Sequence, residues 1–439
     1  MGDRRAPVGS PVVSEPTTTR NEPFKAPTGT RDVLPPESDR WQALIALFAD
    51  HVGKAGYGLV QSPMFEEIGV FSRVGEGTDL VRKEMYDFLD KGERHIALRP
   101  EGTASIARAW IQHGQGEAKP WKVWYAAPSF RYERPQAGRF RQHHQLGAEA
   151  IGTDDPDLDV EVIALLHDFY RSVGLAQVTL LINSMGTADD RRRYIEDVRQ
   201  WLSERLDTLD PKDAEKVVDH PMRVLDSKRP ITIAAIAEAP RITDRLSPEA
   251  AERFERVKSG LASLGIEFTV EPRLVRGLDY YTHTTFEFVS GSLDAAQSTI
   301  GGGGRYDGLI ESLGGPSTPG IGFGSGIERV LLTCDAEGVF PAPANAVDVF
   351  VVDTVDGAAA RDLTVELRRA GISADRAFDG RSMKSQMKSA DKSGAALVCI
   401  IGETEAAAGT VTLRDLRGDT GQQAVDRSAA VAQIAARLS

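Results

Sequence analysis

The sequence predicts an α+β protein, and three observations lead to this fold class. Two apolar segments, 121–131 and 141–151, have the character of antiparallel strands joined by a polar loop. Residues 187–262 are rich in charged residues, leucine and alanine at helical spacing, which indicates a helical insertion between sheet segments. From residue 347 onward strand and helix patterns alternate, which predicts a separate α/β domain at 347–439.

Further elements follow in chain order. Apolar residues at helical spacing between Trp41 and Val52 predict a helix with one buried face. Strand character returns at 266–289, and a glycine-rich strand–turn–helix follows at 319–333. Residues 336–346 have the composition of a linker.

Length and composition are those of a multidomain globular protein. At about 150 residues per domain, 439 residues suggest roughly three units. Hydrophobic residues make up 41% and charged residues 26%, which excludes a wholly disordered chain. The formal net charge of −12 excludes a uniformly basic nucleic-acid coat but not local basic patches. No apolar run approaches the roughly 18 residues of a membrane span, so we expect no membrane association.

The N-terminus and the cysteines indicate the compartment. Residues 1–23 contain prolines and a threonine run without an apolar segment, so we expect a disordered tail; a transit peptide is the alternative. Cys334 and Cys399 stand outside any CxxC motif, which excludes a disulfide framework and disfavours a zinc site. We therefore expect no metal site built from protein ligands, and a reducing cytoplasm.

Several nucleotide-binding and hydrolase motifs are absent. The chain has no GxxxxGK[ST] phosphate loop, no GxGxxG fingerprint, no HExxH and no GxSxG. If a nucleotide binds, arginines and a sheet surface must hold it.

Two pairs of polar residues fit a small polar ligand. Glu101 and Thr103 are two apart across a glycine and, in an extended strand, share one face, where both can accept from an ammonium group. Gln145, Gly147 and Glu149 alternate in the same way, and Gly147 leaves a space between two polar side chains. A surface turn and an exposed strand face are the respective structural alternatives.

Arginines mark the candidate phosphate contacts. Residues 130–141 carry four arginines and one acid, and the planar guanidinium fork suits phosphate; a solvated hairpin tip is the alternative. Arg276 precedes Tyr280 and Tyr281, which point to opposite faces if extended, so that one lines a pocket and the other packs. The glycine runs around 301–304 and before Arg329 fit close approach of a ligand, or else a flexible loop and tight packing.

Five segments together resemble a known family. LRPEGT, FRYERPQAGRFRQHHQLGAE, LVRGLDYYT, GGGGRYDGL and GFGSGIER are similar, in order and content, to segments of class II aminoacyl-tRNA synthetases and specifically of the histidyl-tRNA synthetase family. RGLDYYT with GGGGRYD resembles the histidine-specific signature, whereas the motifs around Arg131 and Arg329 indicate only the class fold and ATP use. The resemblance runs from Thr28 to the end of the chain and is weak within 187–262.

The resemblance implies an architecture and an activity. It implies an antiparallel sheet flanked by helices, and a homodimer with the segment around Pro63 at its interface. The implied activity is ATP-dependent attachment of histidine to tRNA(His) through histidyl-adenylate, with Mg²⁺ bridging the phosphates. The expected parts are a tail at 1–23, a catalytic core at 24–186 and 263–335, a helical insertion at 187–262, a linker at 336–346 and an anticodon-binding α/β domain at 347–439.

Roles for individual residues follow from the same resemblance. Arg276 is expected to be the catalytic arginine, and Arg131 to act with it on the α-phosphate. The ATP-binding set is Arg131, Glu133, Arg139 and Arg329. The ammonium group of histidine is expected to contact Glu101, Thr103 and Gln145. The imidazole nitrogens are expected to form hydrogen bonds with Glu149 and Tyr281, and Tyr280 is expected to lie beside them. Acceptor-end contacts of the tRNA fall to Arg134 and Gln136.

The C-terminal domain carries a basic pattern. Arg381, Lys384, Lys388 and Lys392 step by three, four and four residues, which predicts one helix face, with Met383 on another, packed face. In an anticodon domain we expect Arg381, Lys384 and Lys388 to contact RNA; an ordinary solvated helix is the alternative.

Two rival functions share parts of this pattern. A synthetase-like regulatory subunit that assists an ATP phosphoribosyltransferase has the fold and the histidine pocket, but normally lacks the C-terminal domain and parts of the ATP set. Residues 347–439, Arg131 and Arg329 therefore favour the enzyme. A histidine or RNA sensor would not need Arg276. Tyr132 and His143 depart from the family pattern, and neither is expected to carry chemistry.

Overall fold

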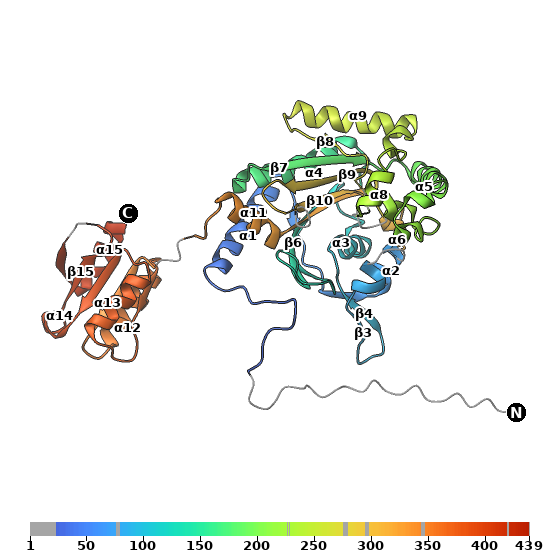
Figure 1. The fold of residues 1–439 in the computed structure, drawn as a ribbon. Helices are drawn as coiled ribbons and strands as arrows, with labels where there is room; N and C mark the ends of the chain where they lie inside the picture. The colour runs from blue at the N-terminus through green and yellow to red at the C-terminus, as the bar shows by residue number, and fades with distance from the viewer. Residues whose placement is uncertain are drawn as a thin grey trace. The chain divides into compact units, whose positions relative to one another are not determined.

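The structure is a computed structural model that describes residues 23–75, 80–225, 227, 229–274, 280–294, 298–343, 347–418 and 421–438. Contacts divide the chain into two compact units (Figure 1). The first unit comprises Met1–Val33 and Phe48–Val339, and the second comprises Leu34–Leu47 and Phe340–Ser439. Among the described residues, no helix combines the length and the apolarity that crossing a membrane requires.

An eight-stranded sheet forms the centre of the first unit. Its strands, in spatial order, are β1 (Gly58–Leu59), β5 (Trp121–Phe130), β6 (Gln142–Ile151), β11 (Gly320–Gly326), β10 (Thr299–Arg305), β9 (Thr282–Ser290), β7 (Val178–Ser184) and β8 (Thr269–Val270). The six inner strands pair antiparallel, and only the short edge strands β1 and β8 pair parallel. The predicted α+β class and the predicted strand pair, here β5 and β6, are confirmed.

Helices cover this sheet (Figure 1). Helix α4 (Pro156–Val173) begins at Asp155, whose side chain accepts from the Asp157 N–H, and ends at Gly174, whose φ of 97° is the left-handed conformation typical of a helix end. Its Tyr170 hydroxyl lies 2.8 Å from Ser325 Oγ of β11, which fixes the helix against the centre of the sheet. The other helices of this unit are α3 (Thr103–Ala109), α10 (Leu309–Ser312) and α11 (Ile327–Glu337), with a π-helical turn, η2 (Trp110–Gly114), after α3. Helix α1 (Glu37–Lys54) belongs to this unit from Phe48 onward.

A small antiparallel sheet projects from the first unit (Figure 1). Its strands, in spatial order, are β2 (Phe65–Glu67), β4 (His95–Leu98) and β3 (Asp87–Leu89). Two short helical segments, α2 (Gly69–Gly75) and η1 (Leu80–Glu84), lie between β2 and β3 in the chain. Arg99 ties its base to the main sheet, since Nε donates to the Pro128 carbonyl at 2.7 Å. Four apolar side chains of this region are about half exposed or more: Met64, Phe65, Phe88 and Leu89.

Residues 188–263 of the first unit are mainly helical, as the spacing predicts. The α-helices are α5 (Ala188–Ser203), α6 (Pro211–Ala214), α7 (Pro221–Leu225), α8 (Pro230–Ala235) and α9 (Pro248–Ser263), with 3₁₀ turns η3 (Leu206–Thr208) and η4 (Ile242–Asp244). Thr187 and Asp190 form a capping box at the start of α5. Tyr194, Val198 and Leu202 of α5 lie in a core that this region forms largely with its own side chains.

The second unit contains a five-stranded mixed sheet. Its order is β13 (Ala374–Arg376), β12 (Val349–Asp353), β14 (Leu397–Ile401), β15 (Thr410–Asp415) and β16 (Gln422–Asp426). The first three strands are parallel and the last two antiparallel. The surrounding helical segments are α12 (Ala358–Arg369), α13 (Met383–Lys392), α14 (Glu403–Ala408), η5 (Arg427–Ala429) and α15 (Ala430–Leu438). Apolar clusters on both faces of the sheet give this unit its own core, which confirms the predicted α/β domain.

Candidate active site

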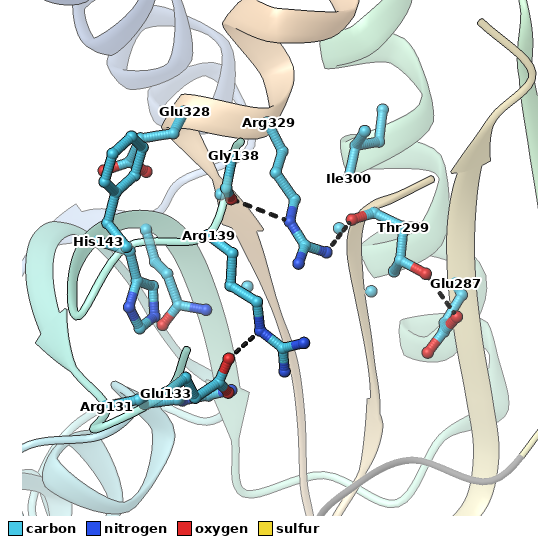
Figure 2. A pocket seen from close by; sticks show the side chains of 16 residues that line it. Arg131, Glu133, Gly138, Arg139, His143, Glu287, Thr299, Ile300, Glu328 and Arg329 are labelled. Atoms are coloured by element: carbon cyan, nitrogen blue, oxygen red, sulfur yellow. Dashed lines mark hydrogen bonds and ion pairs between the residues drawn. The ribbon is translucent and has the colours of Figure 1, made fainter. Parts of the chain in front are cut away.

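A cavity of about 330 Å³ lies on the main sheet of the first unit, and arginines dominate it (Figure 2). Arg131 and Arg139 come from the β5–β6 loop, and Arg329 comes from the first turn of α11. Arg329 reaches between two backbone carbonyls, with Nε 3.3 Å from Gly138 O and an Nη 2.7 Å from Thr299 O. Three guanidinium groups from two separate segments therefore face one space.

The cavity carries both signs of charge, because the carboxylates of Glu133, Glu287 and Glu328 line it beside the three arginines. Burial, followed by the charges of Arg139 and Arg131, lowers the pKa of the Arg329 guanidinium. Glu133 offsets part of the charge through an ion pair with Arg139. Burial and the nearby Arg131 lower the pKa of His143 to about 3, so that its imidazole is neutral at physiological pH. A bound phosphate group relieves the mutual repulsion of the arginines.

His143 lines the same cavity, although no chemical role was predicted for it. Its neighbour His144 is held by Glu328 of α11, which accepts the His144 backbone N–H at 2.9 Å. This contact holds the start of β6 against α11, and His143 lines the cavity from the same strand face as Gln145 (Figure 2).

The carboxylate of Glu149 is the centre of a second, closed part of the site. Glu149 is fully buried on β6. Thr103 Oγ1 donates to Oε1 at 2.7 Å, the Tyr306 hydroxyl donates to Oε2 at 2.7 Å, and the Tyr125 hydroxyl lies 3.5 Å from Oε1. Burial raises the pKa of Glu149 to about 8, even though these hydroxyls stabilise the ionised form.

Glu101 and Thr103 do not lie on one strand, and this expectation is wrong. Gly102 has helical dihedrals (φ −89°, ψ −34°), and helix α3 begins at Thr103. The Glu101 carboxylate accepts the backbone N–H groups of Thr103 at 2.7 Å and Ala104 at 2.9 Å, so it caps the first turn of the helix. The start of the helix brings the Thr103 hydroxyl to Glu149.

Tyr280 and Tyr281 point the same way, contrary to the expected opposite orientation. Their rings lie 4.8 Å apart, and both line a cavity of about 630 Å³ beside α5 and α7. Opposite orientation requires an extended chain, but Tyr280 lies in a turn and β9 begins only at Thr282. The ring of Tyr280 also lies 6.1 Å from that of Tyr306, which connects the pair to the Glu149 site. Arg276 lies outside the described residues.

Comparisons with known proteins identify the family of this chain. A family profile described as Histidyl-tRNA synthetase matches residues 29–330, and one described as Anticodon binding domain matches residues 347–437. The chain belongs to the histidyl-tRNA synthetase family.

Relatives in this family cover nearly the whole chain. A histidine–tRNA ligase of Synechococcus sp. is 47% identical over 406 residues, which cover 90% of this chain and 92% of the relative. One of Saccharopolyspora erythraea is 47% identical over 397 residues, covering 90% and 94%. A solved structure of apo S. aureus histidyl-tRNA synthetase matches with a TM-score of 0.79 at 37% identity, covering 94% of this chain and 99% of that one.

Two further residues of the histidyl-tRNA synthetase fold contact Glu149 and were missed from the sequence. Tyr306 belongs to the GGGGRYD signature, so its place in the motif was a signal. Tyr125 is the direct cross-strand partner of Gly147, and its ring covers that glycine. The space expected over Gly147 is therefore filled by Tyr125, which an account of one strand at a time does not include.

The loop between β5 and β6 presents the two acceptor-end candidates to solvent. Arg134 and Gln136 are exposed. Backbone hydrogen bonds between Gln136 and Arg139, of 3.1 and 2.9 Å, close a tight turn in which Gly138 has a φ of 66°. Arg139 therefore lines the arginine cavity, whereas Arg134 lies outside it.

The basic face in the second unit is smaller than predicted. Helix α13 begins at Met383, so Lys384, Lys388 and Lys392 share an exposed face, but Arg381 precedes the helix. The reason is Gln386, which is buried and donates to the carbonyls of Arg381 at 2.7 Å and Asp353 at 2.6 Å. Met383 is 37% exposed rather than packed, and the buried positions of this helix are Gln386 and Ala390.

Proposed function

We propose that this chain activates histidine with ATP to form histidyl-adenylate and then transfers the histidyl group to tRNA(His), releasing AMP and pyrophosphate. One observation carries this proposal: the arginine cavity and the buried Glu149 site lie on the same sheet and share strand β6. An anion-binding cavity beside a buried acceptor for N–H groups suits a substrate pair of ATP and histidine.

The arginine cavity is proposed to bind ATP. Arg131 contacts the α-phosphate, Arg139 the terminal phosphate, and Arg329 the adenine and the γ-phosphate. Glu133 is proposed to accept a hydrogen bond from the adenine amine. This requires the Arg139–Glu133 ion pair to break, or the Glu133 carboxylate to bind both groups at once. The convergence of three guanidinium groups on one cavity supports this assignment, because each can form charge-assisted hydrogen bonds to phosphate oxygens.

Mg²⁺ is proposed to accompany ATP. Glu287 and Glu328 line the cavity, and carboxylate oxygens are ligands that Mg²⁺ accepts alongside phosphate oxygens and water. Glu287 would hold it together with the ATP phosphates, because the Glu328 carboxylate already accepts the His144 backbone N–H. When bound, the ion neutralises charge on the phosphate oxygens.

The buried Glu149 site is proposed to bind histidine. Glu149 and Tyr281 hydrogen-bond the imidazole nitrogens, and Tyr280 packs beside them. Glu101, Thr103 and Gln145 receive the ammonium group. Two of these groups already have partners: Glu101 caps α3 and Thr103 bonds Glu149, so the ammonium must use the remaining lone pairs of these oxygens.

Adenylate formation is proposed to need no protein nucleophile. The histidine carboxylate attacks the α-phosphorus, the new C–O–P linkage forms, and the bond to the pyrophosphate oxygen breaks. Arg276 and Arg131 stabilise the charge that develops on the α-phosphate oxygens. A terminal tRNA hydroxyl then takes the histidyl group and AMP leaves. Positioning and electrostatics supply the catalysis.

Transfer RNA is proposed to contact both units. The exposed Arg134 and Gln136 meet its acceptor end. Lys384 and Lys388 on α13, with Arg381 before it, meet phosphates near the anticodon. The proposed division is a tail at 1–23, a catalytic core at 24–186 and 263–335, a helical insertion at 187–262, a linker at 336–346 and an anticodon-binding domain at 347–439.

A homodimer in the cytoplasm is the proposed working form. The exposed apolar side chains of Met64, Phe65, Phe88 and Leu89 beside Pro63 support an interface on the small sheet. Two buried cysteines that form no disulfide, Cys334 and Cys399, support a reducing compartment.

Histidine-dependent ATP–pyrophosphate exchange tests the proposal, with the other standard amino acids as controls. We expect exchange with histidine alone. Histidine binding without exchange would contradict the proposal and favour the regulatory-subunit function, because that function needs the histidine pocket but no adenylate chemistry.

A further inference from the structure

Every second residue of strand β11 is a glycine, and these glycines face one side of the sheet. A side chain of the proposed site lies over each of them, so the strand supports a row that runs from the closed end of the site to the arginine cavity. The pairs are Gly320 with Tyr306, Gly322 with Glu149, Gly324 with Gln145 and Gly326 with Arg329.

Gly322 has the least room of these four. In the antiparallel register it is the direct partner of Glu149. The Glu149 side chain folds across its partner, so that a methyl group on Gly322 would overlap Oε2 and Cδ of the carboxylate first and would also lie 2.6 Å from the backbone oxygen of Ala148. The strand conformation at Gly322 is open to any residue, so the requirement for glycine here is space.

The same arrangement recurs one strand away, at Gly147. The three atoms that a methyl group on Gly147 would meet first all belong to the Tyr125 side chain, which lies flat across it. In this position the Tyr125 hydroxyl is 3.5 Å from Glu149 Oε1, while Tyr306, lying over Gly320, donates to Oε2. The glycines thus let three polar side chains meet in one layer close to the sheet.

The arginine end of the row is less constrained. A methyl group on Gly324 would lie 3.2 Å from Gln145 Nε2, the mobile end of a flexible side chain. One on Gly326 would lie 3.9 Å from Arg329 carbons, an ordinary van der Waals distance. The steric demand for glycine therefore rises along β11 from the phosphate side toward Glu149.

We propose that Gly322 and Gly147 are specificity-determining positions for histidine, because the absence of a side chain at both sets where the Glu149 carboxylate meets an imidazole N–H. This inference rests on the proposed function, in which Glu149 contacts the imidazole. Hydrogen bonds weaken steeply when the acceptor leaves the donor axis. A methyl group that lifts the carboxylate removes that contact and leaves the arginine cavity in place.

Gly322→Ala in the full chain tests this in the histidine-dependent ATP–pyrophosphate exchange assay. We expect the KM for histidine to rise about 10- to 100-fold, as for loss of a buried hydrogen bond, while the KM for ATP keeps its parental value. A purely structural defect would raise both constants or lower the active fraction, so this split distinguishes positioning from damage.

Two further variants calibrate the result. Gly324→Ala, on the same strand face, is expected to raise the histidine KM less, because the Gln145 amide can move aside. Gly53→Ala on α1 is the matched control: its methyl group meets no atom within 4 Å, and both KM values should be parental.

The outcomes separate the two proposals. If the parental chain exchanges and Gly322→Ala keeps the parental histidine KM, the specificity proposal is overturned while the function stands. An equal rise in both KM values also overturns it. If Gly322→Ala does not fold by circular dichroism, Gly147→Ala decides by the same split. No exchange by the parental chain rejects the proposed function and this inference together.

Discussion

The two ends of the candidate site on the main sheet face opposite electrostatic problems. At one end Arg131, Arg139 and Arg329 face a common cavity, and their charges oppose one another. At the other end Glu149 is buried, and the hydrogen-bond donors that reach its oxygens are neutral hydroxyls in the part of the chain that the structure describes. The first end therefore presents guanidinium groups together with three carboxylates, whereas the second presents one buried carboxylate surrounded by hydroxyl groups.

One sheet can therefore carry two groups of residues with different tasks, one for affinity and one for selectivity. Guanidinium groups around a cavity bind phosphate through charge and through their planar fork of donors, and any phosphate ester can meet both demands. A buried carboxylate whose neighbours are fixed by packing is more discriminating, since a ligand without the matching N–H leaves it unpaired. We therefore expect substitutions at the two ends to have distinct kinetic signatures.

Glu149→Gln should have the largest effect. The glutamine amide has the shape of the carboxylate, but one of its two oxygens is replaced by an NH₂ group. This group is a donor and faces hydroxyls that donate to the carboxylate in the parent, and it cannot accept an N–H from the ligand. We expect kcat/KM for histidine to fall by about 10⁴-fold, in the range for sites built to bond a polar ligand group. Pyrophosphate exchange measures this, and equilibrium ATP binding should be unchanged. A matching loss of ATP affinity would show that the two ends are not separable.

Arg329→Ala should rank second and show the reverse signature. We expect kcat/KM for ATP to fall by about 10²–10³-fold, as for loss of one preorganised electrostatic contact. Titration calorimetry should give histidine binding close to that of the parent. Arg329→Lys is the control: it keeps the charge but loses the planar fork, so we expect little recovery. Full recovery by lysine would mean that charge alone is needed.

Tyr306→Phe should have a smaller effect, with a defined direction in pH. Removing one hydrogen bond to a buried group should raise the histidine KM about 10-fold. The Tyr306 hydroxyl lowers the pKa of Glu149, so its loss raises that pKa above the parental value of about 8. The ionised carboxylate then forms at higher pH.

The resulting pH profile is the measurement for this variant. We expect the rise of kcat/KM for histidine with pH to move upward in Tyr306→Phe relative to the parent. The substrate titrates identically in both assays, so its own imidazole cancels in the comparison. A profile that moves downward, or that stays in place, would mean that Tyr306 does not act through Glu149.

Lys384→Ala and Lys388→Ala should have the smallest effects and should leave both ends of the site untouched. Each should reduce the slope of log K for tRNA against log salt by about 0.7–0.9, the value for one phosphate contact. Pyrophosphate exchange should be parental. Lys54→Ala, another exposed lysine, is the control and should keep the parental slope. Unchanged slopes in the α13 variants would assign that face to solvent.

Patterns along one strand were predictable from the sequence, and relations across strands were not. Alternation alone placed Gln145, Gly147 and Glu149 on one face of β6, and the loop arginines followed from composition. The contact of Tyr125 with Glu149 depends on the register of β5 against β6. The contact of Tyr306 depends on the end of β10, two strands away.

Helix boundaries caused the other differences. Thr103 and Arg381 both lie at the start of a helix, where a shift of one or two residues changes what a side chain faces. Glu101 stabilises the first turn of α3, and Gln386 links the start of α13 to β12. Both are tertiary or capping contacts that spacing alone does not contain.

The glycines of β11 also have a consequence for the order in which the protein matures. Glycine has little intrinsic preference for strands, so β11 depends on β6 and β10 on either side of it. The ribosome completes Glu149 long before it reaches Gly322, and domains generally fold as units. A nascent chain that ends before β11 contains the β5–β6 loop and Glu149 but not the strand against which they pack. Under the proposed function, substrate discrimination therefore arises only after this strand has entered the sheet.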